Sequence, residues 1–190
     1  MELRIKRVSD FELTGDGAAD AWSQADWQTL KPVDAPDAYP TRAKVVWSDK
    51  GLYFLVDCED ERLGCTITED NANLFKEDVV EFFVQPDETQ RTYIEYEISP
   101  LDYELPLMVI NSGRKFHGWL PWHYEGPRLI RHAAAVRGGA QASMAKIAGW
   151  SVEAFIPFAL MVGLGDVPPR PGSVWRANIR RWASTCRGTR

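Results

Sequence analysis

The sequence predicts an all-β fold built as a two-sheet antiparallel β-sandwich. Apolar and polar residues alternate with a period of two from end to end, which is the pattern of half-buried strands. No window keeps an apolar stripe at helical spacing for more than about two turns, so long helices are not expected. Gly and Pro residues punctuate the alternating stretches, as they do between the strands of a sandwich.

The first half of the chain shows the clearest strands. Residues 3–6 alternate in a short first strand, and residues 22–27 favour one helical turn. Residues 41–47 and 52–58 flank a tight loop that ends at Gly51, a residue able to take the positive φ that such turns need. These two stretches therefore predict a β-hairpin.

Later stretches continue the same pattern. Residues 77–84 and 92–99 are each followed by a Pro that cannot continue a strand, and they read as adjacent antiparallel strands. Further strands are expected at residues 129–136, 150–156 and 174–181, with a brief helix opened by Pro157.

Length and charge limit the class of protein. At 190 residues, with 45% hydrophobic residues, the chain fits one domain spanning residues 1–190. The net charge of −5 argues against a nucleic-acid partner, which needs clustered Lys and Arg. The start of the chain lacks the apolar core of a secretory signal, and no stretch approaches the roughly 18 apolar residues of a membrane span. No membrane partner is expected, and the oligomeric state stays open.

A long aromatic segment at residues 113–127 is expected to be a loop. It carries Trp119 and Trp122, with His and Tyr side chains around them. Flat rings of this kind can stack on a sugar, and they can equally fold back as a lid on the edge of the sandwich. Both interpretations remain open.

Two groups of acidic residues are candidates for chemistry. Asp57, Glu59, Asp60 and Asp78 offer oxygen ligands for calcium, with Asp60 as the candidate metal ligand, but a solvated acidic strand end explains them as well. The three His residues lack the His-x-x-x-His spacing of a zinc site.

The second acidic group comprises Glu81, Glu95 and Glu97. Strand-borne carboxylates that face a cleft are what a glycosidase uses, whereas pairing with basic residues across a sheet is the structural alternative. The sequence has neither a Gly-x-Ser-x-Gly nucleophile motif nor a phosphate-binding Gly-rich loop. We therefore expect a protein that is not an enzyme.

The order of several segments resembles family 9 carbohydrate-binding modules, in particular the stand-alone family-9-like proteins of the DOMON-like sandwich group. The segments that carry the resemblance are Trp22 and residues 41–60, 76–84, 93–100, 149–157 and 172–178. The resemblance implies an immunoglobulin-like or jelly-roll sandwich and non-catalytic binding of plant-type glycan ends between two aromatic rings. It also implies bound calcium and a location outside the cell or in the periplasm.

Site residues follow from the resemblance position by position. The first aromatic ring of the family matches Phe75, three residues before Asp78. A polar sugar contact on the same strand matches Glu81, and a second polar contact on the late strand falls near Arg180.

The second ring of the family lies in a closing segment beyond the late strand, and residues 181–190 do not match that segment. We therefore expect the domain to lack the closing strand, and two alternatives stay open: the C-terminus is truncated or altered, or another aromatic takes the place of the second ring. The candidates are Trp119, Trp122 and Trp182.

Three hypotheses follow from the sequence. The first is a carbohydrate-binding module using Phe75, Glu81, Arg180 and Trp119 or Trp122. The second is a glycoside-active enzyme that uses Glu81 and Glu95. The third is a structural or interaction domain that has lost its ligand.

Overall fold

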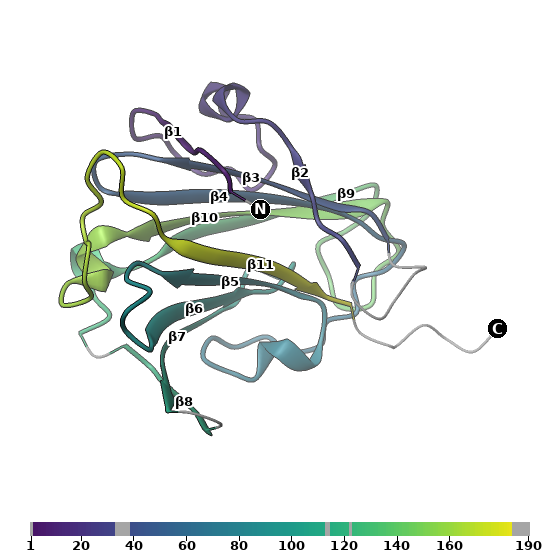
Figure 1. The fold of residues 1–190 in the computed structure, drawn as a ribbon. Coiled ribbons are helices and arrows are strands. Elements are labelled where there is room, and N and C mark those ends of the chain that lie inside the picture. Colours follow the sequence, from purple (N-terminus) through teal and green to yellow (C-terminus); the bar gives the residue numbers. More distant parts are fainter. Residues whose placement is uncertain (1, 33–38, 113–114, 122, 184–190) are drawn as a thin grey trace.

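A computed structural model of the protein describes residues 2–32, 39–112, 115–121 and 123–183. Two sheets lie face to face in these residues and form the two layers that Figure 1 shows from the side. This arrangement confirms the predicted β-sandwich, because side chains from the two inner faces interdigitate in one core.

The first sheet follows the order β1-β3-β4-β10-β9, with β2 paired to β3. Its strands are β1 (Lys6–Arg7), β2 (Gln28–Thr29), β3 (Thr41–Trp47), β4 (Gly51–Glu59), β9 (Arg131–Arg137) and β10 (Gly149–Pro157). The pairs are antiparallel, including the predicted hairpin of β3 and β4, except that β1 runs parallel to β3. Parallel neighbours need a crossover, which the chain makes over the outer face of this sheet.

The second sheet follows the order β11-β5-β6-β7-β8, and all its pairs are antiparallel. Its strands are β5 (Val79–Gln85), β6 (Thr92–Ile98), β7 (Glu104–Ser112), β8 (Lys115–Trp119) and β11 (Arg176–Trp182). The predicted pairing of β5 with β6 is thereby confirmed.

Helical structure is confined to short 3-10 helices among the described residues. These are η1 (Asp20–Gln24), η2 (Leu74–Lys76), η3 (Gly126–Arg128) and η4 (Phe158–Met161). The first and the last agree with the turn expected at residues 22–27 and the brief helix expected after Pro157. In the part of the chain that the structure describes, no helix has the length and apolar character needed to cross a bilayer.

The expectation that residues 113–127 form a loop is wrong for residues 115–119. Part of this segment is β8, which pairs with β7, and no strand was expected at β7 either. The alternation signal fails at β7 because its Leu105–Ile110 stretch is nearly all apolar and contains Pro106. It fails at β8 because every residue of this edge strand is exposed.

The core lies between the two sheets. Phe54 of β4 packs on Phe82 of β5, with ring centroids 4.7 Å apart, and Tyr96 of β6 lies 6.2 Å from Phe82. Trp150 of β10 is fully buried beside them, whereas Trp175 is partly buried against the same cluster. Since alternate residues point to opposite faces, the residues between these core positions lie on the outer faces of the sheets.

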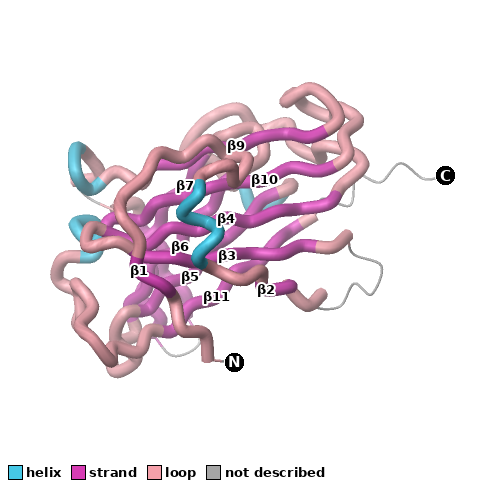
Figure 2. The backbone as a smooth tube through the Cα atoms, turned by 90° about the horizontal axis from the view of Figure 1, so that it is seen from above, coloured by secondary structure: helices cyan, strands magenta, loops and turns pink. Residues whose placement is uncertain are grey.

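The outer face of the first sheet is covered by the N-terminal segment. Figure 2, seen from above, shows η1 and the loops around it lying across the strands of this sheet. Trp22 of η1 is buried there against Val46, Tyr53, Leu55 and Phe155. On the outer face of the second sheet, Leu74 of η2 packs with Val79 of β5 and Leu105 of β7. Along β11 this face carries exposed residues. The second sheet is therefore the one that offers a binding face.

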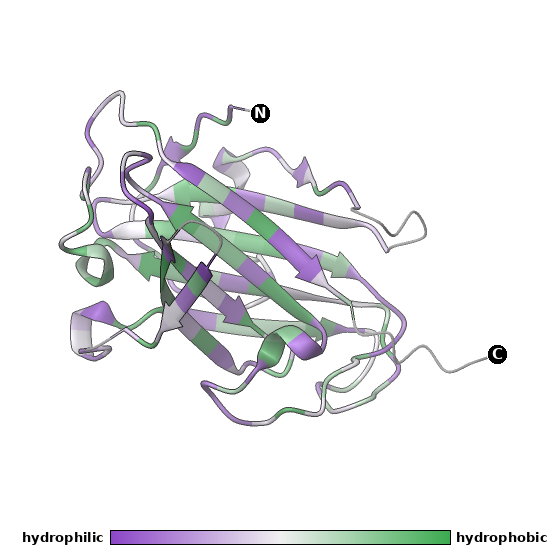
Figure 3. Ribbon diagram, turned by 60° about the horizontal axis from the view of Figure 1, so that its bottom comes forward, coloured by the Kyte–Doolittle hydropathy of each residue, from purple (hydrophilic) through white to green (hydrophobic). Residues whose placement is uncertain are grey.

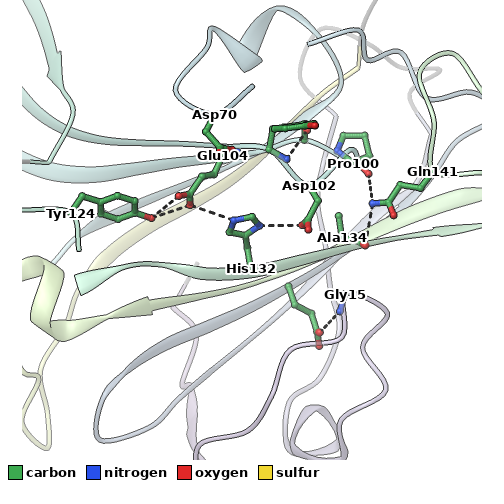
Figure 4. Close-up of polar contacts among 12 residues, drawn as sticks. Gly15, Asp70, Pro100, Asp102, Glu104, Tyr124, His132, Ala134 and Gln141 are labelled. Atoms are coloured by element: carbon green, nitrogen blue, oxygen red, sulfur yellow. Dashed lines mark hydrogen bonds and ion pairs between the residues drawn. The ribbon is translucent and has the colours of Figure 1, made fainter. Parts of the chain in front are cut away.

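One carboxylate holds the N-terminal segment in place. Glu153 of β10 is fully buried, and its Oε2 accepts hydrogen bonds of 2.6 Å from the backbone N–H groups of Thr14 and Gly15. Its Oε1 accepts a hydrogen bond from the Trp22 indole Nε1. Figure 4 labels Gly15 and draws its hydrogen bond to the Glu153 carboxylate as a dashed line.

We expect Glu153→Gln to lower the free energy of unfolding by about 1–3 kcal/mol, because the amide turns an N–H group toward donors that then lose their acceptor. Urea unfolding of wild type and variant measures this difference. Glu12→Gln is the control, since the Glu12 side chain is 94% exposed and its change should be close to zero. Equal midpoints for the two variants would contradict this role of Glu153.

Candidate functional site

The outer face of the second sheet carries a band of charged residues across three strands. Glu81 of β5 lies directly opposite Arg180 of β11 on one side and Glu97 of β6 on the other. Glu95 lies two residues before Glu97 on the same face. Figure 3 shows how hydrophilic and hydrophobic residues alternate along the strands of this sheet. Side chains of β11 alternate between the two faces, with Ile179 packed on the core and Arg180 on the outer face.

The three glutamates form a compact cluster. One oxygen from each of Glu81, Glu95 and Glu97 lies within 4.8 Å of the others. All three side chains are buried, and Glu97 is only 1% exposed. The Arg180 Nε lies 3.8 Å from the Glu81 Oε2 and supplies a counter-charge from the half-exposed edge of the cluster.

Burial and mutual repulsion favour the protonated forms of these carboxyls. Burial, and then the charge of Glu81, raises the pKa of Glu95 to about 7. Burial together with the charges of Glu81 and Glu95 raises the pKa of Glu97 to about 8, although a hydrogen bond from the Phe75 backbone opposes the shift. Burial also raises the pKa of Glu81, against the influence of Arg180. The cluster can therefore hold protons near neutral pH and donate hydrogen bonds as well as accept them.

Two exposed aromatic rings lie at the same end of this face. Phe75 belongs to η2, four residues before Val79, and Trp182 pairs with Val79 at the end of β11. Each of the two side chains is 43% exposed. The Arg180 guanidinium lies over the Trp182 ring at 4.1 Å from its centroid, which fixes the two side chains relative to each other. The site thus has two rings and a charged pair.

A shallow depression of about 280 Å³ lies farther along the same face. Phe83, Tyr93 and Asn178 line it, together with Val84, Gln85, Arg176 and Ala177. The Phe83 and Tyr93 rings are tilted, with centroids 6.3 Å apart. Rings and an amide in one depression provide flat apolar faces next to hydrogen-bonding groups.

Trp119 does not lie on this face. It pairs with Met108, which packs against the core, and directly paired residues point to the same side of a sheet. Trp119 is 50% exposed because it stands on the edge strand β8, and its ring stacks on His117 at 5.7 Å. The structure therefore does not place Trp119 with Phe75, Glu81 and Arg180, contrary to the expectation from the sequence. Trp122 lies outside the described residues.

Asp60, the candidate metal ligand, lies at the end of the sandwich between the sheets. Its Oδ2 pairs with Arg181 of β11, and its Oδ1 accepts hydrogen bonds from the backbone of Glu61 and Arg62. The side chains of Asp60 and Arg181 are 9% and 7% exposed. This geometry accounts for Asp60 without an ion, and its role as a metal ligand stays a prediction.

A second polar cluster surrounds His132, drawn in Figure 4. The His132 Nδ1 lies 3.1 Å from Asp102, its Nε2 lies 3.7 Å from Glu104, and the Tyr124 hydroxyl contacts both Glu104 oxygens. Burial would lower the pKa of His132, but the hydrogen bond to Asp102 and the nearby acidic charges outweigh it and raise that pKa. Because these contacts join β9 to β7 and the segments around them, the cluster ties the two sheets together at one edge.

The sequence indicates several residues of this site, but it does not show which of them lie next to one another. Period-two alternation beyond Arg180 would place Trp182 on the same stripe, if the late strand were extended by one residue. The grouping of Glu81 with Glu95 and Glu97 depends on the register of β5 and β6, which alternation alone does not fix.

Comparison with known proteins agrees with this architecture. The profile of the family described as "Carbohydrate family 9 binding domain-like" matches residues 14–162. A candidate carbohydrate-binding protein from Bacteroides uniformis ATCC 8492 is similar in structure, with a TM-score of 0.74 and 15% identity over 97% of this chain and 85% of its own.

A family 9 module from Caldicellulosiruptor kristjanssonii is also similar. In complex with cellotriose it has a TM-score of 0.63 and 16% identity over 96% of this chain and 77% of its own. In complex with glucose it has a TM-score of 0.61 and 16% identity over 94% of this chain and 80% of its own. No curated protein matches the sequence. The family match over residues 14–162 shows that the chain belongs to the carbohydrate family 9 binding domain-like proteins.

Proposed function

We propose that the protein binds carbohydrate without catalysis, on the outer face of its second sheet. The observation that carries the proposal is the pair of exposed rings, Phe75 and Trp182, at the end of the face that also holds Glu81 and Arg180. The solved family 9 module from Caldicellulosiruptor kristjanssonii was obtained in complex with cellotriose and with glucose, which supports a β-glucan or related plant-type glycan as the ligand. A location outside the cell or in the periplasm would suit such a ligand.

The proposed mechanism follows from the chemistry of a sugar ring. The C–H face of a pyranose packs on a flat aromatic ring, and its hydroxyls form hydrogen bonds at the rim. Phe75 and Trp182 would supply the flat faces, while Arg180 donates and Glu81 accepts hydrogen bonds. Charge-assisted hydrogen bonds are about twice as strong as neutral ones, so the Glu81 and Arg180 pair sets the orientation of the ring.

The depression at Phe83, Tyr93 and Asn178 extends the site along β11. We propose that it accepts a further sugar unit, so that an oligosaccharide binds more tightly than a single sugar. A stronger response to cellotriose than to glucose would support this extension.

Titration of glucose, cello-oligosaccharides and xylo-oligosaccharides against intrinsic Trp fluorescence tests the proposal, because Trp182 lies in the site. We expect Trp182→Ala to weaken binding by about 2- to 13-fold, since an aromatic stacking contact contributes about 0.5–1.5 kcal/mol. Trp119→Ala is the matched control, because this half-exposed Trp lies on the other side of the sheet. Absence of any response at millimolar glycan, or equal losses in both variants, would refute the proposal.

A glycosidase is the second candidate, because Glu95, with its raised pKa, lies next to Glu81 and such a pair can act as acid and base. Release of reducing sugar from the same oligosaccharides, lost in Glu95→Gln, would favour this candidate over simple binding.

A further inference from the structure

The cluster of Glu81, Glu95 and Glu97 brings together charges that repel one another. Glu81 and Glu97 stand directly opposite each other on neighbouring strands, and like charges at such positions are destabilising. Glu95 adds a third carboxylate with an oxygen within 4.8 Å of the other two. Apolar residues at these buried positions would pack without electrostatic repulsion, so stability of the fold alone does not explain three glutamates here.

Two oxygens of the cluster have no hydrogen-bond partner among the described residues. They are the Oε2 atoms of Glu81 and Glu97, and both are buried, although the Glu81 Oε2 lies 3.8 Å from the Arg180 Nε. The side chains that carry them are 4% and 1% exposed. Buried polar atoms in native proteins are nearly always hydrogen-bonded or bound to an ion. Two buried acceptors in one acidic cluster therefore point to a positively charged ligand.

The charge balance indicates the charge of that ligand. Arg180 contacts the cluster at 3.8 Å, and its guanidinium also lies over Trp182. When a bound cation displaces the protons that this cluster holds near neutral pH, three ionised carboxylates and one guanidinium leave an excess of two negative charges. One divalent cation would neutralise this excess, whereas a single ammonium group would not.

The ligand atoms favour a hard cation. All three are carboxylate oxygens, which suit Mg²⁺, Ca²⁺ and Mn²⁺, whereas zinc sites in proteins are built mostly from Cys and His. Ca²⁺ binds oxygens at about 2.3–2.6 Å in flexible geometry, and Mg²⁺ demands a near-ideal octahedron at about 2.0–2.1 Å. Oxygens spread up to 4.8 Å apart can surround Ca²⁺ with little rearrangement.

We propose that Glu81, Glu95 and Glu97 bind a divalent cation, with Ca²⁺ as the ion that the spacing favours. The cation would lie on the same face as the proposed glycan site but at a position separate from Asp60. Its binding requires no glycan, so this proposal stands independently of the proposed function.

Isothermal titration of CaCl₂ into the full chain, after EDTA treatment and without any sugar, tests the proposal. We expect saturable binding to the wild type and at least about tenfold weaker binding to Glu97→Gln and to Glu81→Gln, since each substitution removes one charged ligand. The Gln variants keep the shape of the side chain, and thermal unfolding checks that they are folded. Glu125→Gln, at an exposed position in a loop, is the control that should bind as the wild type does.

A second measurement uses Tb³⁺ in place of Ca²⁺. We expect terbium emission sensitised by nearby aromatic residues in the wild type, and its loss in Glu97→Gln. No saturable calcium binding up to about 10 mM, above the range of about 10⁻⁴–10⁻³ M for extracellular calcium modules, would overturn the proposal. Calcium binding that survives both Gln variants and is lost in Asp60→Asn would overturn it too. Tighter binding of MgCl₂ or MnCl₂ would overturn the choice of Ca²⁺.

Discussion

Arg181→Ala is expected to lower the free energy of unfolding by about 3–5 kcal/mol, the usual cost of removing one partner from a buried ion pair. Arg181 points into the sandwich from β11, where its guanidinium pairs with Asp60. It also donates hydrogen bonds to the Thr41 hydroxyl at 3.2 Å and to the Glu59 carbonyl at 2.8 Å. The Ala variant leaves the Asp60 carboxylate buried without its counter-charge.

The neighbouring residue provides the control for this prediction. Arg180 lies on the opposite side of the same strand, its side chain is half exposed, and its contact with Glu81 spans 3.8 Å. Arg180→Ala should therefore change stability by less than about 1 kcal/mol while weakening any glycan binding. Urea unfolding of both variants gives the comparison, and equal stabilities would contradict the buried-pair argument.

A double-mutant cycle separates the ion pair from the loss of packing. If Asp60 is the group left uncompensated, Asp60→Ala in the Arg181→Ala background should cost less than the same change in the wild type. Strictly additive effects would instead assign the loss to the Arg181 contacts with Thr41 and Glu59.

The sequence predicts the scaffold well because burial on one face imposes alternation. The β3 and β4 hairpin was predicted because residues alternate on both sides of a loop that ends at Gly51. Strand β7 was missed because its apolar run has no alternation, and β8 because none of its residues is buried. Both failures occur at strands whose environment differs from that of a half-buried strand.

The site is less predictable because it depends on pairing between distant strands. Phe75, Glu81 and Arg180 were inferred from resemblance and lie along one face. Trp119 was grouped with them because it is an aromatic residue in a variable segment, yet its pairing with Met108 turns it to the other side. A shift of one residue in register reverses every side chain of a strand, and composition does not determine register.

The metal-free protein is expected to become less stable as the pH rises from about 5 to 8. Glu95 and Glu97 have folded-state pKa values of about 7 and about 8, raised mainly by burial and then by neighbouring carboxylates. An unfolded Glu loses its proton near pH 4.3. Between these values the folded state binds more protons than the unfolded state, so unfolding becomes more favourable as the pH rises.

Other groups shift stability in the same direction over this range. The pKa values of Glu81 and Glu104 are raised mainly by burial, and that of His132 is raised by Asp102 and Glu104 against the effect of burial. Their stabilisation is present at low pH and is lost as the pH rises through the folded pKa. Since one pKa unit corresponds to about 1.4 kcal/mol, the melting temperature should fall by at least several degrees between pH 5 and pH 8.

Thermal unfolding in EDTA at a series of pH values measures this dependence. The Glu95→Gln, Glu97→Gln double variant supplies the matched comparison, because it keeps the shape of both side chains and removes their titration. We expect a flatter pH profile for the double variant and a higher melting temperature than wild type at pH 8, where the wild-type cluster must carry its charges. Parallel profiles for the two proteins would show that the buried glutamates do not govern the pH dependence. The buried glutamates of the second sheet therefore lower the stability of the fold at neutral pH. Such a loss of stability is expected of a surface that is selected for binding.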